Sequence, residues 1–366
     1  MPSVASLLPQ AHTALQRCYS TVPKACGSGR ALPPLRLAFV ITHRCNLKCA
    51  WCMVTHEGNR RTWNATEELS PAGIERVVRQ SVPWCMVTIT GGEPFVRHDI
   101  MDILDRVARL RPTHLVTNGT VAHAEQIDWL AAHAARAVIG RGLVTVGVSL
   151  EGPADLHDDV VQVPGSHAKT LAFVERLLEA RRATDRYLPL IDMKVVLSKD
   201  NWASLPTFRA DMARLGVDMM TVQIQNNQAS AYGIRSDDMT AHLRAPAPVD
   251  EIPAGPLLEM LRELSSEGRS APGRVRFTPP IPVEHIAAHY RGELRPSMLD
   301  CHATWTTAHV GPYGDLFPCF SYPMGSVRHA SLAAIWNGPS YRAFRTALKA
   351  AGAFPGCIGC CMASAR

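Results

Sequence analysis

The sequence predicts an α/β protein with an open or partial (β/α)6 barrel, followed by a small cysteine-bearing C-terminal domain. Six short β-branched or apolar runs alternate with stretches of helical periodicity. Because parallel strands need long crossovers, this alternation indicates a parallel sheet. The C-terminal domain is predicted by cysteine placement, since five of the eleven cysteines lie between positions 301 and 361.

The composition excludes several classes of protein. Of the 366 residues, 46% are hydrophobic and 19% charged, which is typical of globular domains and excludes a disordered or coiled-coil chain. No apolar run reaches the ~18–20 residues of a membrane span. The net charge of +6 is spread without a basic block, so we expect no nucleic-acid partner. An odd cysteine count without a secretory signal favours metal ligation in the cytoplasm over a disulfide framework.

The strands and helices follow from local patterns. The six predicted strands are Leu35–Thr42, Met86–Thr90, His114–Thr117, Leu143–Leu150, Leu190–Leu197 and Val217–Ile224. Apolar residues at helical spacing lie between consecutive strands. Ser70 followed by Pro71 predicts an N-cap and a proline at the first helical position.

The chain divides into four predicted regions. Residues 1–34 contain no Asp or Glu and only a weak apolar pattern, so we expect a frayed or loosely docked N-terminal extension. Residues 35–245 form the barrel. Prolines interrupt residues 246–298, which predicts a connector with one helix at about Pro256–Glu267. Residues 299–366 form the cysteine-bearing domain.

Three cysteines cluster on the loop after the first strand, at Cys45, Cys49 and Cys52. Three thiolates on one short loop can hold three corners of a cubane iron–sulfur cluster and leave one iron open for a ligand. The alternative is a zinc site, which needs four ligands, so that His43 or His56 would have to supply the fourth.

This loop, followed one β/α unit later by Gly91-Gly92-Glu93-Pro94, resembles the radical S-adenosylmethionine superfamily. The resemblance implies a 4Fe–4S cluster that binds S-adenosylmethionine. It also implies that the glycine turn and Glu93 hold the cofactor's ammonium group, because glycines permit close backbone approach and a carboxylate is a charged acceptor. The cofactor-binding residues implied in this way are Trp51, Gly91, Gly92, Glu93, Pro94, Ser149 and Ile224.

The segment after the fourth strand, Ser149-Leu150-Glu151-Gly152, is similar to the family's Ser-Leu-Asp-Gly segment, and His157-Asp158 follows as in many relatives. Those relatives often carry an arginine where this chain has Val161. Lys194 on the fifth strand is therefore a candidate partner for the cofactor's carboxylate, with simple surface exposure as the alternative.

The C-terminal cysteines resemble an auxiliary-cluster domain of the SPASM/twitch type. The resemblance implies a second 4Fe–4S cluster on Cys301, Cys319, Cys357 and Cys360, with Cys361 a spare or a replacement for Cys360. The end of the chain at Arg366 fits the shorter, twitch form with one cluster. A four-cysteine zinc site is the alternative.

The resemblance implies reductive cleavage of S-adenosylmethionine to a 5′-deoxyadenosyl radical that abstracts hydrogen from a substrate, with a flavodoxin or ferredoxin-type electron donor. The short N-terminal extension and the short C-terminal form favour a small polar substrate that is oxidised, epimerised or rearranged in natural-product biosynthesis. The alternative is ribosomal-peptide maturation, and a more remote one is a non-catalytic iron–sulfur or zinc protein. Polar residues expected around the barrel mouth are Asn118, Gln223, Gln225 and Asp300, the last three being candidate catalytic groups.

Overall fold

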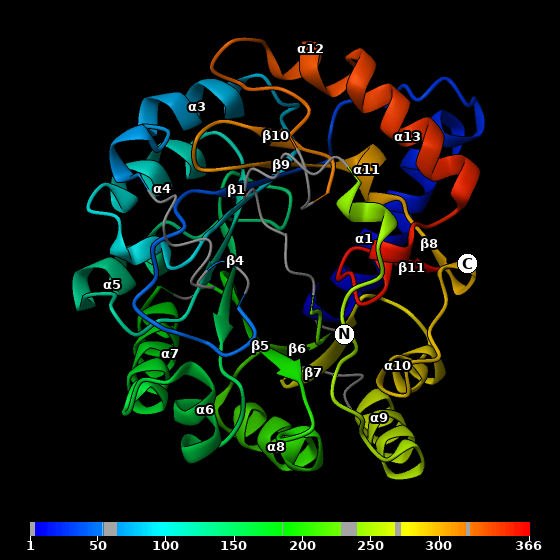
Figure 1. The fold of residues 1–366 in the computed structure, drawn as a ribbon. Coiled ribbons are helices and arrows are strands. Elements are labelled where there is room, and N and C mark those ends of the chain that lie inside the picture. The colour runs from blue at the N-terminus through cyan, green and yellow to red at the C-terminus, as the bar shows by residue number, and fades with distance from the viewer. Residues whose placement is uncertain are drawn as a thin grey trace.

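A nine-stranded sheet forms the centre of the protein in the computed structural model, which describes residues 4–52, 54, 64–184, 186–227, 240–267, 272–319 and 323–366. The strand order is β10-β9-β1-β2-β3-β4-β5-β6-β7. Every neighbouring pair from β9 to β7 is parallel, and only β10 runs antiparallel to its neighbour β9. This arrangement confirms the predicted parallel sheet of a partial barrel (Figure 1).

All six predicted strands exist, with ends that differ by a few residues at most. They are β1 (Arg36–Val40), β2 (Met86–Thr90), β3 (Pro112–Thr117), β4 (Gly142–Ser149), β5 (Leu190–Leu197) and β6 (Met219–Ile224). Strand ends depend on which backbone groups find a partner in the neighbouring strand, and composition alone does not specify this.

Helices connect the strands and cover the outer face of the sheet (Figure 1). They are α3 (Pro71–Arg79), α4 (Ile100–Ala108), α5 (Ala124–Ala132), α6 (Ala154–Val161), α7 (Ser166–Ala183) and α8 (Leu205–Leu215). The predicted start of α3 is confirmed, since the Ser70 hydroxyl accepts a hydrogen bond from Gly73 N–H and Pro71 opens the helix. Alternate strand residues pack against these helices in one continuous apolar core.

The proline-rich stretch is more than a connector with one helix, which corrects the sequence prediction. The predicted helix is present as α9 (Ala254–Glu267), but β7 (Arg274–Thr278) then pairs in parallel with β6, and α10 (Val283–Tyr290) follows. Pro279, Pro280 and Pro282 all come after the strand and before the helix. They therefore remove no hydrogen bond from the ladder.

The N-terminal extension is a helix docked on the C-terminal region, which corrects the frayed form of the expectation and agrees with docking. Helix α1 (Val4–Ala25) lies against the C-terminal region. The Ser20 hydroxyl and His302 Nδ1 are 2.7 Å apart, and Lys24 forms an ion pair with Asp300. These partners lie more than 270 residues away in the sequence, where no local pattern can indicate them.

The C-terminal region is joined to the barrel through the sheet itself. It comprises β8 (Leu299–Asp300), α11 (Ala303–Thr306), β9 (Thr307–Val310), β10 (Leu316–Phe317), α12 (Leu332–Trp336), α13 (Pro339–Ala351) and β11 (Ser364–Ala365). Strand β9 pairs with β1, so the C-terminal cysteines are held on the same framework as the N-terminal ones. Across the described part of the chain, no helix is both long and apolar enough to span a bilayer.

Candidate cofactor sites

A cavity of about 250 Å³ opens at the carboxyl ends of the strands, where parallel sheets commonly place chemistry. The predicted site residues that line it are Cys45, Cys49, Trp51, Cys52, Gly91, Gly92, Ser149 and Gln223. The loop after β1, the turn after β2 and the end of β4 thus meet in one place, as the resemblance implied. We call this the first cavity.

The glycine turn holds the cysteine loop through its backbone. Gly92 N–H donates to Thr42 O at 2.8 Å, and Glu93 N–H donates to Arg44 O at 2.9 Å. A Cβ on Gly91 would lie 2.5 Å from Thr42 O, and one on Gly92 would lie 2.3 Å from Arg44 O. Only glycine permits this approach, so the turn fixes the backbone immediately before Cys45.

Helix α6 holds the other side of the same loop. Lys48 N–H donates to Val161 O at 3.0 Å, and Ala50 N–H donates to Val160 O at 3.1 Å. Leu47 packs against both valines. Val161, where the resemblance implied an arginine, supports the cysteine loop through its carbonyl and side chain.

The three loop thiols suit an iron–sulfur cluster in their chemistry. Burial raises the pKa of Cys45 to about 12, and burial together with the charge of Glu151 raises the pKa of Cys49. Such thiols stay protonated unless a metal centre supplies the positive charge that stabilises the thiolate. No three His, Cys, Asp or Glu side chains of the described residues are arranged around a single ion. A single zinc would need that arrangement, whereas the thiolates of a cubane bind different irons.

The histidines that the zinc alternative required do not strengthen it. His43 is buried and lies edge-on to the ring of Tyr313, with 5.9 Å between ring centroids. It does not line the first cavity. His56 lies outside the described residues.

Glu93 and Pro94 lie behind the cavity wall. The Glu93 carboxylate is fully buried and accepts hydrogen bonds from Phe95 N–H at 3.0 Å, Thr117 Oγ1 at 2.7 Å and Asn118 N–H at 2.7 Å. Burial raises its pKa to about 7 despite these donors. Its contact with a cofactor ammonium stays a prediction.

Strand alternation decides which residues of β6 reach the first cavity. Gln223 lines it, whereas Ile224 points to the opposite face and is fully buried in the apolar core. Gln225 lies beyond the strand, where its backbone N–H donates to Tyr290 OH and its Nε2 donates to Asn227 Oδ1. Neither Ile224 nor Gln225 therefore lines the first cavity.

Lys194 does not line the first cavity either, which corrects its candidacy as carboxylate partner. Its Nζ lies 2.7 Å from Asp192 Oδ2, and Arg276 binds the same oxygen at 3.1 Å. The Lys194 side chain crosses Gly147, where an added Cβ would clash with it at 2.2 Å. The lysine is thus held in an ion pair within β5, and Arg276 of β7 binds the same carboxylate.

Asp300 is a structural residue in this arrangement, contrary to its candidacy as a catalytic group. It pairs with Lys24 of α1 and lies 3.2 Å from His302 Nε2. Burial alone would raise the pKa of Asp300, but the bonds from His302 and Lys24 outweigh it and hold the pKa well below the usual range. The carboxylate lies outside both cavities.

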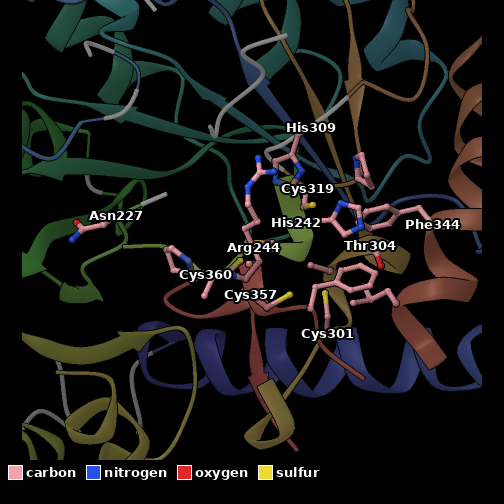
Figure 2. A pocket seen from close by; sticks show the side chains of 18 of the residues that line it. Asn227, His242, Arg244, Cys301, Thr304, His309, Cys319, Phe344, Cys357 and Cys360 are labelled. Carbon is pink, nitrogen blue, oxygen red and sulfur yellow. The ribbon is translucent and has the colours of Figure 1, made fainter. Parts of the chain in front are cut away.

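A second cavity of about 230 Å³ is lined by Cys301, Cys319, Cys357 and Cys360, the four predicted ligands of an auxiliary cluster. Figure 2 shows these side chains on its wall, with Arg244 and His242 beside them. Burial raises the pKa of Cys301, and burial together with the nearby thiols of Cys301 and Cys319 raises that of Cys357. Four converging thiols of this kind fit a fully ligated cluster.

Sequence reasoning assigned no role to two buried groups that line the first cavity, Glu151 and His157. Burial raises the pKa of Glu151 to about 7, and burial followed by the charge of His167 lowers that of His157 to about 4. Glu151 N–H donates to His157 Nδ1 at 3.1 Å. The position of Glu151 just after β4 was the available signal, because residues at the carboxyl ends of parallel strands converge. His157 lies further along, in α6.

Comparison with known proteins gives two family matches. Residues 39–195 match the model of the radical SAM superfamily, and residues 301–361 match the model of an iron–sulfur cluster-binding domain, SPASM. The two matches contain the two cysteine sets that line the two cavities. The cofactors are therefore S-adenosylmethionine, the 4Fe–4S cluster that binds it, and auxiliary iron–sulfur.

Similar proteins include two curated relatives. The antilisterial bacteriocin subtilosin biosynthesis protein AlbA of Bacillus subtilis is 25% identical over 325 residues, which cover 86% of this chain and 62% of AlbA. This chain thus spans less than two thirds of that relative. The PqqA peptide cyclase of Bradyrhizobium diazoefficiens is 24% identical over 326 residues, covering 85% of this chain and 75% of the cyclase.

The fold has solved counterparts as well. SuiB of Streptococcus suis, in a structure bound to S-adenosylmethionine, superposes with a TM-score of 0.62 at 18% identity. The match covers 91% of this chain and 73% of SuiB. At this identity the likeness establishes the shared fold.

Proposed function

As this chain belongs to the radical SAM superfamily and carries a SPASM domain, we propose that it is a maturase that modifies a peptide by radical chemistry. The single observation that carries the enzyme assignment is the first cavity, where three loop thiols face the Gly91-Gly92 turn. A passive electron carrier has no need of an open coordination site beside a cofactor-holding turn.

The peptide substrate is supported by the relatives. AlbA is a bacteriocin biosynthesis protein, the PqqA cyclase acts on a peptide, and SuiB has been solved with its precursor peptide SuiA. This evidence favours the alternative reading of the sequence over the small polar substrate. We therefore propose that the substrate is a peptide.

When bound, the cluster and S-adenosylmethionine supply the organic radical that abstracts hydrogen from the substrate. The residues of this chain would position the cofactor and the substrate and keep water away from the radical. The Gly91-Gly92 turn, Ser149 and Trp51 line the first cavity and would hold the cofactor, and Gln223 lies on the same wall, where it would be available to a substrate. The buried carboxylate of Glu151 is a further polar group on that wall. A flavodoxin or ferredoxin-type protein delivers the electron.

The test is hydrogen transfer from a defined substrate. We would reconstitute the enzyme anaerobically and offer a deuterated precursor peptide encoded beside its gene, with dithionite or flavodoxin as reductant. We expect deuterium in 5′-deoxyadenosine and a mass change in the peptide. The matched control is Trp84→Ala, because Trp84 is an exposed aromatic outside the first cavity and its loss should change neither product.

The outcomes separate the substrate classes. Deuterium transfer from small polar molecules of the same gene neighbourhood, with none from the peptide, would overturn the peptide proposal and leave the radical mechanism standing. An enzyme that holds iron but never forms 5′-deoxyadenosine would overturn the enzyme assignment itself.

A further inference from the structure

Asn118, the residue that follows β3, lies between the glycine turn and the cysteine loop. Its backbone N–H donates to Glu93 Oε2 at 2.7 Å, and its carbonyl accepts from Thr170 Oγ1 at 2.8 Å. Its side-chain Oδ1 accepts from Thr120 N–H at 2.9 Å and from Thr120 Oγ1 at 2.7 Å. Asn118 is 7% exposed, so these bonds hold it in a single orientation within the wall of the first cavity.

The side-chain Nδ2 of Asn118 points to the cysteine loop. It donates to Asn46 Oδ1 at 3.1 Å and to Cys45 Sγ at 3.9 Å. Asn46 Nδ2 in turn donates to Thr120 Oγ1 at 2.7 Å, which closes the network. Both hydrogens of the Asn118 amide are thereby used by the loop, on the wall of the cavity where the sequence predicted this polar residue.

We propose that Asn118 is a positioning residue that links Glu93 to the Cys45 sulfur and raises the reduction potential of the cluster held there. The proposal rests on the assignment of the first cluster to Cys45, Cys49 and Cys52. Reduction adds negative charge to the cluster and its thiolates. An N–H donor aimed at one of these sulfurs stabilises the reduced form more than the oxidised form.

Glu93 sets the direction of this donor. Its carboxylate is held by Phe95 N–H and Thr117 Oγ1 as well as by Asn118 N–H, so it fixes the turn after β3 against the turn after β2. The residue expected to face the cofactor's ammonium and the residue that contacts the cluster sulfur are therefore directly hydrogen-bonded. Two hydrogen-bonded turns thus serve the two cofactors.

The experiment is a redox titration followed by electron paramagnetic resonance on the reconstituted full-length protein. The signal of the first cluster is recognised because added S-adenosylmethionine changes it, whereas a fully ligated auxiliary cluster does not respond. The midpoint potential is then measured without S-adenosylmethionine. We expect Asn118→Ala to shift this potential to lower values and leave the auxiliary signal unchanged.

Thr120→Val is the matched control, because it removes hydroxyl bonds from the same network and keeps the Asn118 donor. We expect its potential to equal that of the wild type. If Asn118→Ala fails to bind iron, Asn118→Leu serves instead, since it keeps the size of the side chain and adds no charge while losing both amide hydrogens. It should also lower the potential.

Three results would overturn the proposal. The potential could stay at the wild-type value in both Asn118 variants, or Thr120→Val could lower it as far as Asn118→Ala does, which would assign the effect to general loss of structure. A wild-type protein without any signal that responds to S-adenosylmethionine would instead overturn the proposed cluster site, and this inference with it.

Discussion

Cys360 and Cys361 are adjacent in the chain, yet they line different cavities. Cys360 lines the second cavity with Cys301, Cys319 and Cys357, whereas Cys361 lines the first cavity. A hydrogen bond with Cys361, followed by burial, raises the pKa of Cys360 well above its ordinary value. The structure therefore favours Cys360 as the auxiliary ligand, a choice that cysteine spacing left open.

The first prediction separates these two thiols. Two cubanes correspond to about eight iron atoms per chain. We expect Cys360→Ala to retain about seven after anaerobic reconstitution, because the auxiliary cubane keeps three thiolates and loses the iron that Cys360 held, and Cys361→Ala to retain all eight. Colorimetric iron analysis checks this, and iron loss in Cys361→Ala alone would reverse the assignment.

The second prediction concerns the loop thiols. The triple variant with alanine at Cys45, Cys49 and Cys52 should form no 5′-deoxyadenosine and keep about four iron atoms, those of the auxiliary cluster. Liquid chromatography and iron analysis measure both quantities. Continued formation of 5′-deoxyadenosine would show that another centre binds the cofactor.

The third prediction concerns Arg345, a fully buried guanidinium in α13. It donates to the carbonyls of Thr304 at 2.7 Å, Trp336 at 2.8 Å and Gly29 at 3.1 Å, and burial lowers its pKa to about 10. Arg345→Met leaves three buried carbonyls without this donor. We expect the free energy of unfolding to fall by about 3–5 kcal/mol.

Urea denaturation of the reconstituted protein measures this loss. Arg342→Met is the control from the same helix, because Arg342 donates one exposed bond to Ser28 O, and its loss should cost about 1 kcal/mol or less. Arg345→Lys should not restore stability, since a single ammonium cannot reach carbonyls that a planar fork spans. Equal losses in Arg345→Met and Arg342→Met would refute the bridging role.

The fourth prediction is a pH dependence that arises from His309. Burial, followed by the charge of Arg36, lowers its pKa to about 4 in the folded chain, against about 6.5 when unfolded. As the pH falls below about 6.5, the unfolded state gains the proton first. The contribution of neutral, buried His309 to the free energy of unfolding is therefore complete above about pH 6.5 and is lost between about pH 6.5 and 4.

Between about pH 7.5 and 5.5 this loss amounts to about 1.4 kcal/mol. His309→Gln should lack it, so its free energy of unfolding should decline less over that interval than the wild-type value does. The exposed His329, changed to Gln, is the control and should leave the pH dependence unchanged. Parallel pH dependences for His309→Gln and the wild type would contradict the prediction.

Local pattern was sufficient for the strands and for the cysteine loop, because both depend on neighbours in sequence. Met86–Thr90 and Leu190–Leu197 were predicted with their observed ends. Local sequence pattern did not predict the location of a side chain where that location depends on the face of a strand or on a partner distant in sequence. Ile224 and Gln225 were chosen by their place at the end of the sixth strand, but alternation puts Ile224 in the core and Gln223 at the cavity.

The sequence by itself determined the parallel α/β sheet, the two cysteine sets and the glycine turn that belongs with the first of them. Each is encoded by residue type at short spacing. Only the tertiary structure shows that α1 is docked and that Lys194 and Asp300 form ion pairs. It also shows that Cys360 and Cys361 line different cavities. The physical reason is that the state of a buried charge depends on the partners that desolvate and neutralise it, and several of these are distant in sequence, such as Lys24 of α1 for Asp300 and Arg276 of β7 for Asp192.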